Sequence, residues 1–182
     1  MVETRTSATR AARSGSSGSE AAQDLDAARE AALRLLERTR RTRHDLVRRL
    51  RDKGYAPVTV EEALDRLQGV GLVDDVEYAR AWLAGRWGRR PAGWRRLEQE
   101  LRLKGVSAED IAQARARLEE DQGGADEVTT ARRVLAQAER RYRSLEPRVR
   151  RQRLYALLAR RGFDGDTIQA ALRHEPEDEA AE

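Results

Sequence analysis

Apolar residues recur every three to four positions along this chain, a spacing that predicts amphipathic helices. Three glycines, Gly54, Gly105 and Gly162, mark a pattern that occurs three times. Leucines stand four and eight residues before each glycine, a basic residue directly before it and an apolar residue directly after it. No apolar-polar alternation of strand length occurs anywhere, so the predicted fold class is all-α.

Each of these glycines is expected to end a helix. A glycine just past the last turn adopts the left-handed C′ conformation without a steric penalty from Cβ. In the Schellman motif that results, the apolar residue after the glycine contacts the leucine four residues before it. The predicted pairs are Leu50–Tyr55, Leu101–Val106 and Leu158–Phe163.

A further helix is expected on either side of each glycine-terminated helix. The preceding helices are predicted at about 25–40, 75–87 and 127–143. The following helices begin near the capping signals Thr59-Val-Glu-Glu62 and Ser107-Ala-Glu-Asp110, and near Asp164 or Asp166. The fold class is therefore all-α, with three tandem three-helix repeats that form an elongated curved array.

The predicted domain organisation follows from these repeats and from the composition between them. The short apolar join at 69–75 favours firmer packing of the first repeat on the second than of the second on the third. The boundaries are a disordered tail at 1–22, helical repeats at 23–73 and 74–121, a linker at 122–126, a third repeat at 127–174 and an acidic tail at 175–182.

Composition narrows the class of protein. Hydrophobic residues make up 39% of the chain and charged residues 37%, which favours thin helical layers over one deep core. The chain has no cysteine, which excludes disulfides, Cys-ligated zinc and thiol nucleophiles and fits a reduced, cytoplasmic protein. It has neither an apolar run of the ~18 residues that a membrane span needs nor an N-terminal secretory signal.

Charge alternates along the chain even though the formal net charge is only +4. Of the 36 cationic residues, only Lys53 and Lys104 are lysines, and the arginines suit phosphates and carboxylates. The basic blocks are 38–53, 80–104 and 132–161, with net charges of +6, +6 and +9. The acidic blocks are 61–77, 107–127 and 164–182, with net charges of −5, −5 and −6.

We expect the basic blocks to form the contact surface for a partner or for DNA. Any single arginine is more often part of a solvated helix face or an intrahelical ion pair, so the prediction concerns the summed patch. The candidates are Arg40, Arg41, Arg43, Arg48, Arg49, Arg86, Arg89, Arg90, Arg95, Arg96, Lys104, Arg148, Arg150, Arg151 and Arg153.

The sequence contains little that favours an enzyme, and no catalytic residue, metal site or cofactor is predicted. His44 and His174 are far apart in the sequence and are interpreted as surface residues. The adjacent Asp74 and Asp75 could hold a divalent ion, but they are better explained as the start of a helix. The tryptophans Trp82, Trp87 and Trp94 are better explained as anchors between helices than as platforms for stacked bases.

The sequence resembles the RecX family of regulatory proteins. The resemblance is carried by Leu72-Val73-Asp74-Asp75, Tyr78-Ala79, Trp82 and Arg86, followed by Gly93, Leu97, Glu100-Leu101 and Lys104-Gly105-Val106. The leucine and glycine patterns around Gly54 and Gly162 extend it over roughly residues 27–174. Trp94 departs from the family, in which this turn is usually made of small residues.

The resemblance implies a cytoplasmic bacterial protein that acts in DNA recombination, DNA repair and the SOS response. It implies binding to the RecA recombinase filament on DNA and inhibition of ATP hydrolysis and strand exchange, with no catalytic residues to carry over. We expect a monomer without a membrane partner, and weak or non-specific binding to DNA alone. Two alternatives stay open: a DNA-binding helical repeat protein without a recombinase partner, and, ranked last, a metal-dependent enzyme at Asp74 and Asp75.

Overall fold

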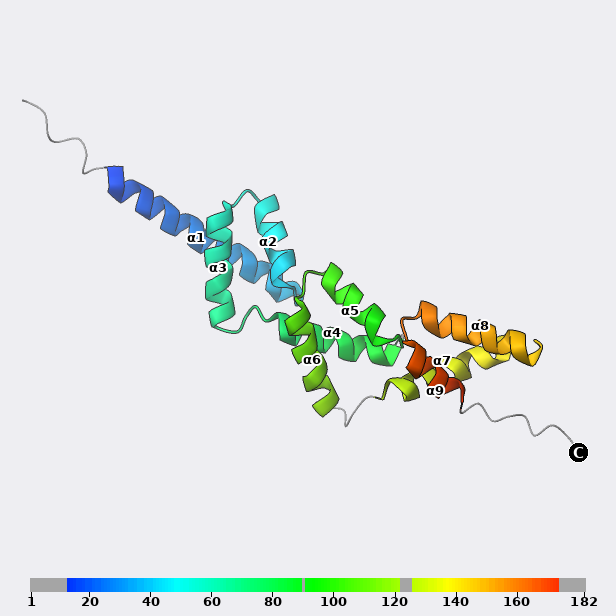
Figure 1. The fold of residues 1–182 in the computed structure, drawn as a ribbon. Helices are drawn as coiled ribbons and strands as arrows, with labels where there is room; N and C mark the ends of the chain where they lie inside the picture. The colour runs from blue at the N-terminus through cyan, green and yellow to red at the C-terminus, as the bar shows by residue number, and fades with distance from the viewer. Residues whose placement is uncertain (1–12, 90, 122–125, 174–182) are drawn as a thin grey trace, which may run out of the picture. The chain divides into compact units, whose positions relative to one another are not determined.

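The structure, a computed structural model, describes residues 13–89, 91–121 and 126–173, without the side chains of 13–23 and 87–89. Within these residues every regular element is a helix, α1 to α9, which confirms the predicted all-α class. The chain divides into two compact units, the first ending at Asp74 and the second beginning at Asp75. The first unit holds one three-helix repeat and the second holds two (Figure 1).

The first unit consists of α1 (Arg13–Arg38), α2 (Arg43–Asp52) and α3 (Pro57–Gly69). Helix α1 packs mainly along α3, and α2 closes the repeat against both. Leucines of α2, spaced four residues apart, supply the centre of the core because this spacing keeps them on one helix face. The core residues are Ala31, Ala32, Leu46, Leu50, Val60, Leu64, Leu67 and Val73.

The second unit contains two repeats with the same order of helices. The second repeat consists of α4 (Asp75–Arg89), α5 (Trp94–Leu103) and α6 (Ala108–Asp121), and the third of α7 (Glu127–Tyr142), α8 (Pro147–Arg160) and α9 (Gly165–Leu172). In each repeat the first helix packs along the third. Each repeat has its own buried cluster, centred on Leu97 and Leu101 in the second and on Leu154 and Leu158 in the third.

The three predicted glycine caps are confirmed. Gly54, Gly105 and Gly162 have φ angles of +94°, +83° and +87°, in the left-handed region. The residue after each glycine donates its N–H to the leucine carbonyl of the predicted pair, at 3.3 Å for Tyr55, 3.2 Å for Val106 and 3.3 Å for Phe163. A fourth cap of this kind, at Gly71 after α3, was not predicted; its φ is +72°, and Leu72 N–H lies 2.9 Å from the carbonyl oxygen of Leu67.

Most predicted helix starts hold, and two, those of α1 and α3, were wrong. Ser107 accepts the N–H of Asp110 at 3.0 Å, and Asp164 accepts the N–H of Thr167 at 2.8 Å. Thr59 caps nothing, because α3 already begins at Pro57, whose fixed φ suits the first helical position. Helix α1 begins at Arg13, inside the segment 1–22 predicted as a tail; the remainder of that prediction, and the acidic tail at 175–182, lie outside the described residues.

A backbone contact joins the second and third repeats. Gly93, directly before α5, donates its N–H to the carbonyl oxygen of Arg161 at 2.9 Å. A Cβ on Gly93 would overlap the carbonyl group of Gly162, and a Cβ on Gly162 would lie 2.8 Å from the backbone nitrogen of Arg96. The second and third repeats belong to one unit, and two glycines let them approach backbone to backbone.

Glu127 adds a side-chain link at the same joint. Its carboxylate oxygen accepts the N–H of Trp94 at 2.9 Å, so the first residue of α7 satisfies an N–H at the start of α5. Burial raises the pKa of Glu127 above its ordinary value, and the hydrogen bond from Trp94 offsets only part of that rise. Asp126, the last residue of the predicted linker, caps α7 through the N–H groups of Val128 and Thr129.

Candidate functional site

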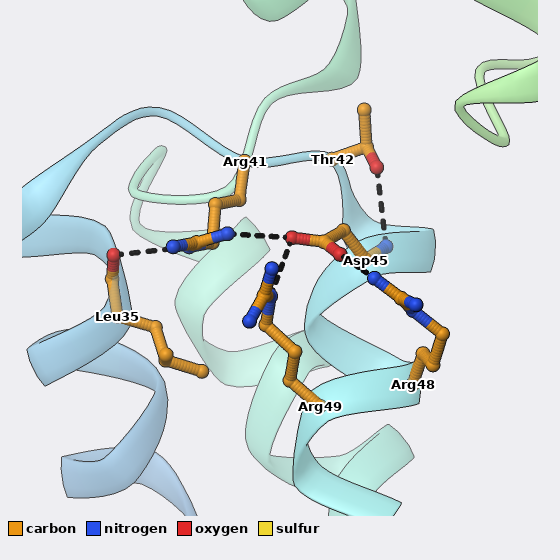
Figure 2. Close-up of polar contacts among 6 residues, drawn as sticks. All are labelled: Leu35, Arg41, Thr42, Asp45, Arg48 and Arg49. Carbon is orange, nitrogen blue, oxygen red and sulfur yellow. Dashed lines mark hydrogen bonds and ion pairs between the residues drawn. The ribbon is translucent and has the colours of Figure 1, made fainter. Parts of the chain in front are cut away.

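Three of the candidate arginines in the first repeat converge on one carboxylate. Arg41 Nη1 and Arg49 Nε each lie 2.8 Å from Asp45 Oδ2, and Arg48 Nη2 lies 2.8 Å from Asp45 Oδ1 (Figure 2). Arg41 Nε also donates to the carbonyl oxygen of Leu35 at 3.2 Å, which ties the last turns of α1 to α2. These arginines therefore have a structural task in addition to their charge.

The electrostatics of this cluster follow from its geometry. Burial raises the pKa of Asp45, but the hydrogen bonds from Arg48, Arg49 and Arg41 outweigh burial and hold the pKa well below its usual range. Asp45 therefore stays ionised at any physiological pH. With one carboxylate against three guanidinium groups, the cluster keeps an excess of two positive charges (3 − 1 = 2).

Arg43 joins two helices of the same repeat. Its Nη2 lies 2.7 Å from a carboxylate oxygen of Glu61 and 2.7 Å from one of Asp65, and Nη1 lies 3.0 Å from Gln68. It thus connects the start of α2 to α3, and its one positive charge faces two carboxylates. Arg40 is exposed in the loop between α1 and α2.

The candidate cations of the second repeat differ in whether they contact an acidic side chain. Arg86 and Arg96 both bind Glu100, at 2.5 Å and 3.0 Å, while Arg95 is exposed and forms no ion pair within the described part of the chain. Lys104 is exposed at the C-cap of α5. Of the two remaining candidates, Arg89 ends α4 with a side chain outside the described residues, and Arg90 lies outside them altogether.

The candidate arginines of α8 differ from those of the first two repeats, because α8 contains no acidic residue. Arg148, Arg151 and Arg153 are exposed, and none has a carboxylate partner among the described residues. Arg150 is half-buried on the same helix. Since Glu146 caps the first turn through the N–H of Val149, the nearest acid serves the backbone and leaves these three guanidinium groups in water.

Tyr155 belongs to this surface and was missed in the sequence. Its side chain is exposed, as is that of Val149. The spacing of seven residues from Arg148 and four from Arg151 places Tyr155 on the same face of α8. That spacing was visible in the sequence, but an aromatic residue among leucines favours a core assignment unless burial is known.

The tryptophans pack as predicted where they are described. Trp94 is buried in the core of the second repeat, with the guanidinium carbon of Arg115 at 4.4 Å from its ring centre. Trp82 is partly buried against the same core, and Arg86 lies over it at 5.3 Å. The side chain of Trp87 lies outside the described residues.

The described residues offer recognition of charged groups by arginine. Among them, no group of three His, Cys, Asp or Glu side chains lies close enough to hold a metal ion. His44 is exposed, and His174 lies outside the described residues. No described helix is both long and apolar enough to cross a membrane. The exposed arginines can bind phosphate or carboxylate groups.

Comparison with known proteins shows the same three-part organisation. Family models match residues 28–67 as the first, 74–114 as the second and 125–172 as the third three-helix domain of RecX. These matches cover the three helical repeats in order.

Similarity to individual proteins extends over most of the chain. A protein of Streptomyces coelicolor named "Regulatory protein RecX" is 37% identical over 158 residues, covering 85% of this chain and 82% of that protein. One of Thermobifida fusca with the same name is 37% identical over 166 residues, covering 91% and 88%. The relatives are thus named as regulatory proteins and not as enzymes.

Solved structures share the fold. The crystal structure of RecX from Lactobacillus salivarius matches with a TM-score of 0.75 at 22% identity, covering 84% of this chain and 96% of that one. A second crystal structure, of a regulatory protein RecX, matches with a TM-score of 0.76 at 24% identity, covering 93% and 81%. Because three domain matches in order and relatives at 37% identity agree over most of its length, the chain belongs to the RecX family of regulatory proteins.

Proposed function

We propose that this protein regulates the RecA recombinase by binding the filament that RecA forms on DNA, and that binding inhibits ATP hydrolysis and strand exchange. One observation carries the proposal: the three RecX domains lie in order on three helical repeats, and the chain is 37% identical to a protein named "Regulatory protein RecX". In this proposal the protein acts in the cytoplasm as a monomer during recombination and DNA repair.

The exposed arginines of α8 are the first candidates for the contact surface. Arg148, Arg151 and Arg153 are exposed, and no described carboxylate offsets their charge. Arginine presents a planar fork of donors that matches phosphate and carboxylate oxygens. These guanidinium groups therefore suit either the phosphates of the DNA in the filament or acidic side chains of the recombinase.

The arginines around Asp45 and Glu100 have a secondary part in this proposal. Each is already held by a carboxylate, so a partner gains less from it than from an arginine of α8. The excess positive charge of each group still adds to long-range attraction toward a polyanion such as a nucleoprotein filament.

Inhibition would follow from binding along the filament groove. A chain that contacts several neighbouring recombinase subunits opposes the subunit movements that ATP hydrolysis and disassembly require. It also occupies space that a second DNA strand needs during strand exchange. Both effects depend on contacts to more than one subunit, so they should weaken together when the contact surface is neutralised.

Direct DNA binding without a recombinase partner is the second candidate. It is favoured by Tyr155, which is exposed on α8 beside arginines without acidic partners. Aromatic side chains next to arginines form stacking platforms for the bases of single-stranded DNA. Few Asn or Gln side chains accompany these arginines, so contacts with phosphates are favoured over reading of a base sequence.

A binding experiment separates the two candidates. A fluorescently labelled single-stranded oligonucleotide is titrated with the protein, once naked and once coated with RecA in the presence of a non-hydrolysable ATP analogue, at the same salt concentration. The regulator proposal expects binding to the coated strand to be at least ~10-fold tighter. Equal affinity for both would favour the direct DNA binder, and no binding to either would contradict both candidates.

A further inference from the structure

A pocket of about 360 Å³ lies where the second and third repeats meet inside the second unit. Helices α4 and α5 and residues 91–92 before α5 form one side, and α7 and the end of α8 form the other. Its volume falls in the range of pockets that bind small molecules. The lining residues are Arg86, Pro91, Ala92, Arg96, Glu100, Gln137 and Arg161.

Positively charged side chains outnumber negatively charged ones among the residues that line this pocket. Three guanidinium groups and one carboxylate face it, which gives a net charge of +2 (3 − 1 = 2). Arg161, from the third repeat, is half-buried and forms no ion pair within the described part of the chain. Gln137 contributes an amide that can donate to an oxygen acceptor.

Glu100 holds the other two arginines in place. Its two carboxylate oxygens accept from Arg86 Nη2 at 2.5 Å and from Arg96 Nε at 3.0 Å. Arg96 Nη1 also reaches the carbonyl oxygen of Arg160 at 3.5 Å. Each guanidinium keeps further N–H donors that Glu100 does not use, and both side chains are already ordered, which lowers the entropy cost of binding a ligand.

We propose that this pocket binds a phosphate group, together with the part of a nucleotide that carries it. The excess of two positive charges matches a phosphate dianion, and fixed arginine forks match its oxygens in geometry. Pro91 and Ala92 give the pocket an apolar wall against which the rest of the ligand can lie. The inference goes beyond the proposed function, because it needs no recombinase.

Occupation of the pocket has a structural consequence. The ligand would contact Arg86 and Arg96 of the second repeat and Arg161 and Gln137 of the third at the same time. Binding therefore adds contacts across the joint that Gly93 and Gly162 form by their backbones. A ligand that binds only the folded joint must raise the unfolding temperature of the protein.

The test uses the full chain without any recombinase. Binding of pyrophosphate is measured by calorimetry and by the shift of the unfolding temperature at low ionic strength, for the parent protein, Arg161→Ala, Arg161→Lys and Arg95→Ala. Arg95 is the matched control, since it is exposed one residue away from Arg96 and does not line the pocket. Circular dichroism of each variant reports whether its helices are intact.

The expected result is that pyrophosphate binds the parent and raises its unfolding temperature. Arg161→Ala should weaken binding at least ~10-fold, Arg161→Lys by an intermediate factor because it keeps the charge and loses the fork, and Arg95→Ala by less than ~2-fold. The proposal is overturned if pyrophosphate does not bind, or if Arg161→Ala and Arg95→Ala weaken binding equally, which would indicate diffuse attraction by surface charge.

Competition then identifies the source of the phosphate. ATP and a short oligonucleotide, with and without a 5′-phosphate, are tested for displacement of pyrophosphate from the parent protein. Displacement by ATP alone supports a free nucleotide, and stronger displacement by the 5′-phosphorylated oligonucleotide than by the unphosphorylated one supports a nucleic-acid end. Failure of all three to displace pyrophosphate contradicts the nucleotide part of the proposal. These outcomes are independent of whether the protein binds a RecA filament.

Discussion

Gly93 and Gly162, 69 residues apart in the sequence (162 − 93 = 69), lie backbone against backbone where the second and third repeats meet. Neither position has room for a side chain. The N–H of Gly93 donates a hydrogen bond to the carbonyl oxygen of Arg161, the residue before Gly162. The glycine that ends α8 therefore has two tasks: it caps its own helix and it admits the neighbouring repeat.

A methyl group at Gly93 should disrupt this joint. We expect Gly93→Ala to lower the free energy of unfolding of the second unit by about 2 kcal/mol or more, because Cβ overlaps backbone atoms that cannot move independently. Chemical denaturation followed by circular dichroism measures the change.

Two glycines serve as controls for this experiment. Gly54→Ala has open space around the new methyl group but keeps a φ of +94°, so it should cost only about 1 kcal/mol. Gly85→Ala, inside α4 and also in open space, should be neutral or slightly stabilising. Equal effects of Gly93→Ala and Gly54→Ala would show that backbone strain alone, and not the overlap, explains the loss.

Removal of the Asp45 carboxylate should destabilise the first repeat. Asp45→Asn leaves Arg41, Arg48 and Arg49 without their shared acceptor charge, and we expect a loss of about 2 kcal/mol at pH 7. Urea denaturation of Asp45→Asn and of the control Asp52→Asn measures it. Asp52 is an exposed acid on the same helix, and no side chain in the described part of the chain donates a hydrogen bond to it, so its replacement should have little effect.

The lowered pKa of Asp45 also predicts that the stability lost in Asp45→Asn depends on pH. The folded pKa of Asp45 is lowered, so its contribution is complete above the unfolded pKa of about 4 and is lost as pH falls through the lower folded value. The stability difference between the parent and Asp45→Asn should therefore shrink when both are measured at pH 2.5 instead of pH 7. A difference that stays constant over this range would contradict the ion-pair account.

Glu127 should behave in the opposite way. Burial raises its pKa, so ionisation of the carboxyl above about pH 4 costs the folded protein stability. Glu127→Gln keeps an acceptor for the N–H of Trp94 and removes the charge, so it should be at least as stable as the parent at pH 7 and lose that advantage at pH 4. Thermal unfolding at both pH values tests this.

Replacement of Glu127 by alanine separates the hydrogen bond from the charge. Glu127→Ala leaves the Trp94 N–H without its partner, and we expect a loss of about 1–3 kcal/mol at pH 7. If Glu127→Gln loses as much stability as Glu127→Ala, the hydrogen bond to Trp94 does not hold the joint.

The contact surface on α8 predicts a change in salt dependence. Replacement of Arg148, Arg151 and Arg153 by glutamine should weaken binding to a RecA-coated strand. If the three contact phosphates of the single strand, the slope of log affinity against log salt should fall by about 2. Binding is measured between 50 and 200 mM salt, because the affinity that comes from phosphate contacts falls steeply over this range.

The matched control removes the same charge elsewhere. Arg29, Arg34 and Arg66 are each exposed and paired with an acid on the same helix, and their replacement by glutamine also lowers the net charge from +4 to +1 (4 − 3 = 1). This variant should bind the coated strand nearly as the parent does. Equal weakening in both triple variants would assign the effect to net charge and not to α8.

Local capping signals and helical stripes allowed most of the fold to be predicted. The leucine pairs before Gly54, Gly105 and Gly162 encode both the buried stripe and the end of each helix, and both are determined by neighbouring residues. The start of α3 was misassigned because Thr59-Val-Glu-Glu62 matches a capping box while Pro57 offers a competing start two residues earlier.

Long-range pairing could not be read in the same way. Nothing local to Gly93 indicates that it meets Gly162, and nothing local to Arg96 indicates that it shares Glu100 with Arg86. The candidate arginines were predicted as one class, although the contacts with Asp45 span only three or four residues and fit the helical period. Only the contact of Arg86 with Glu100, 14 residues away, depends on tertiary packing. Exposure of Tyr155 likewise depends on tertiary packing, which a helical period does not determine.

The central claim is tested most directly by the ATPase activity of RecA stimulated by single-stranded DNA, with this protein titrated into preformed filaments. The account predicts that hydrolysis falls as the protein is added and that the Arg148, Arg151 and Arg153 triple variant needs a higher concentration for the same effect. Hydrolysis that stays at its starting rate, at concentrations where the protein saturates the filament, would contradict it.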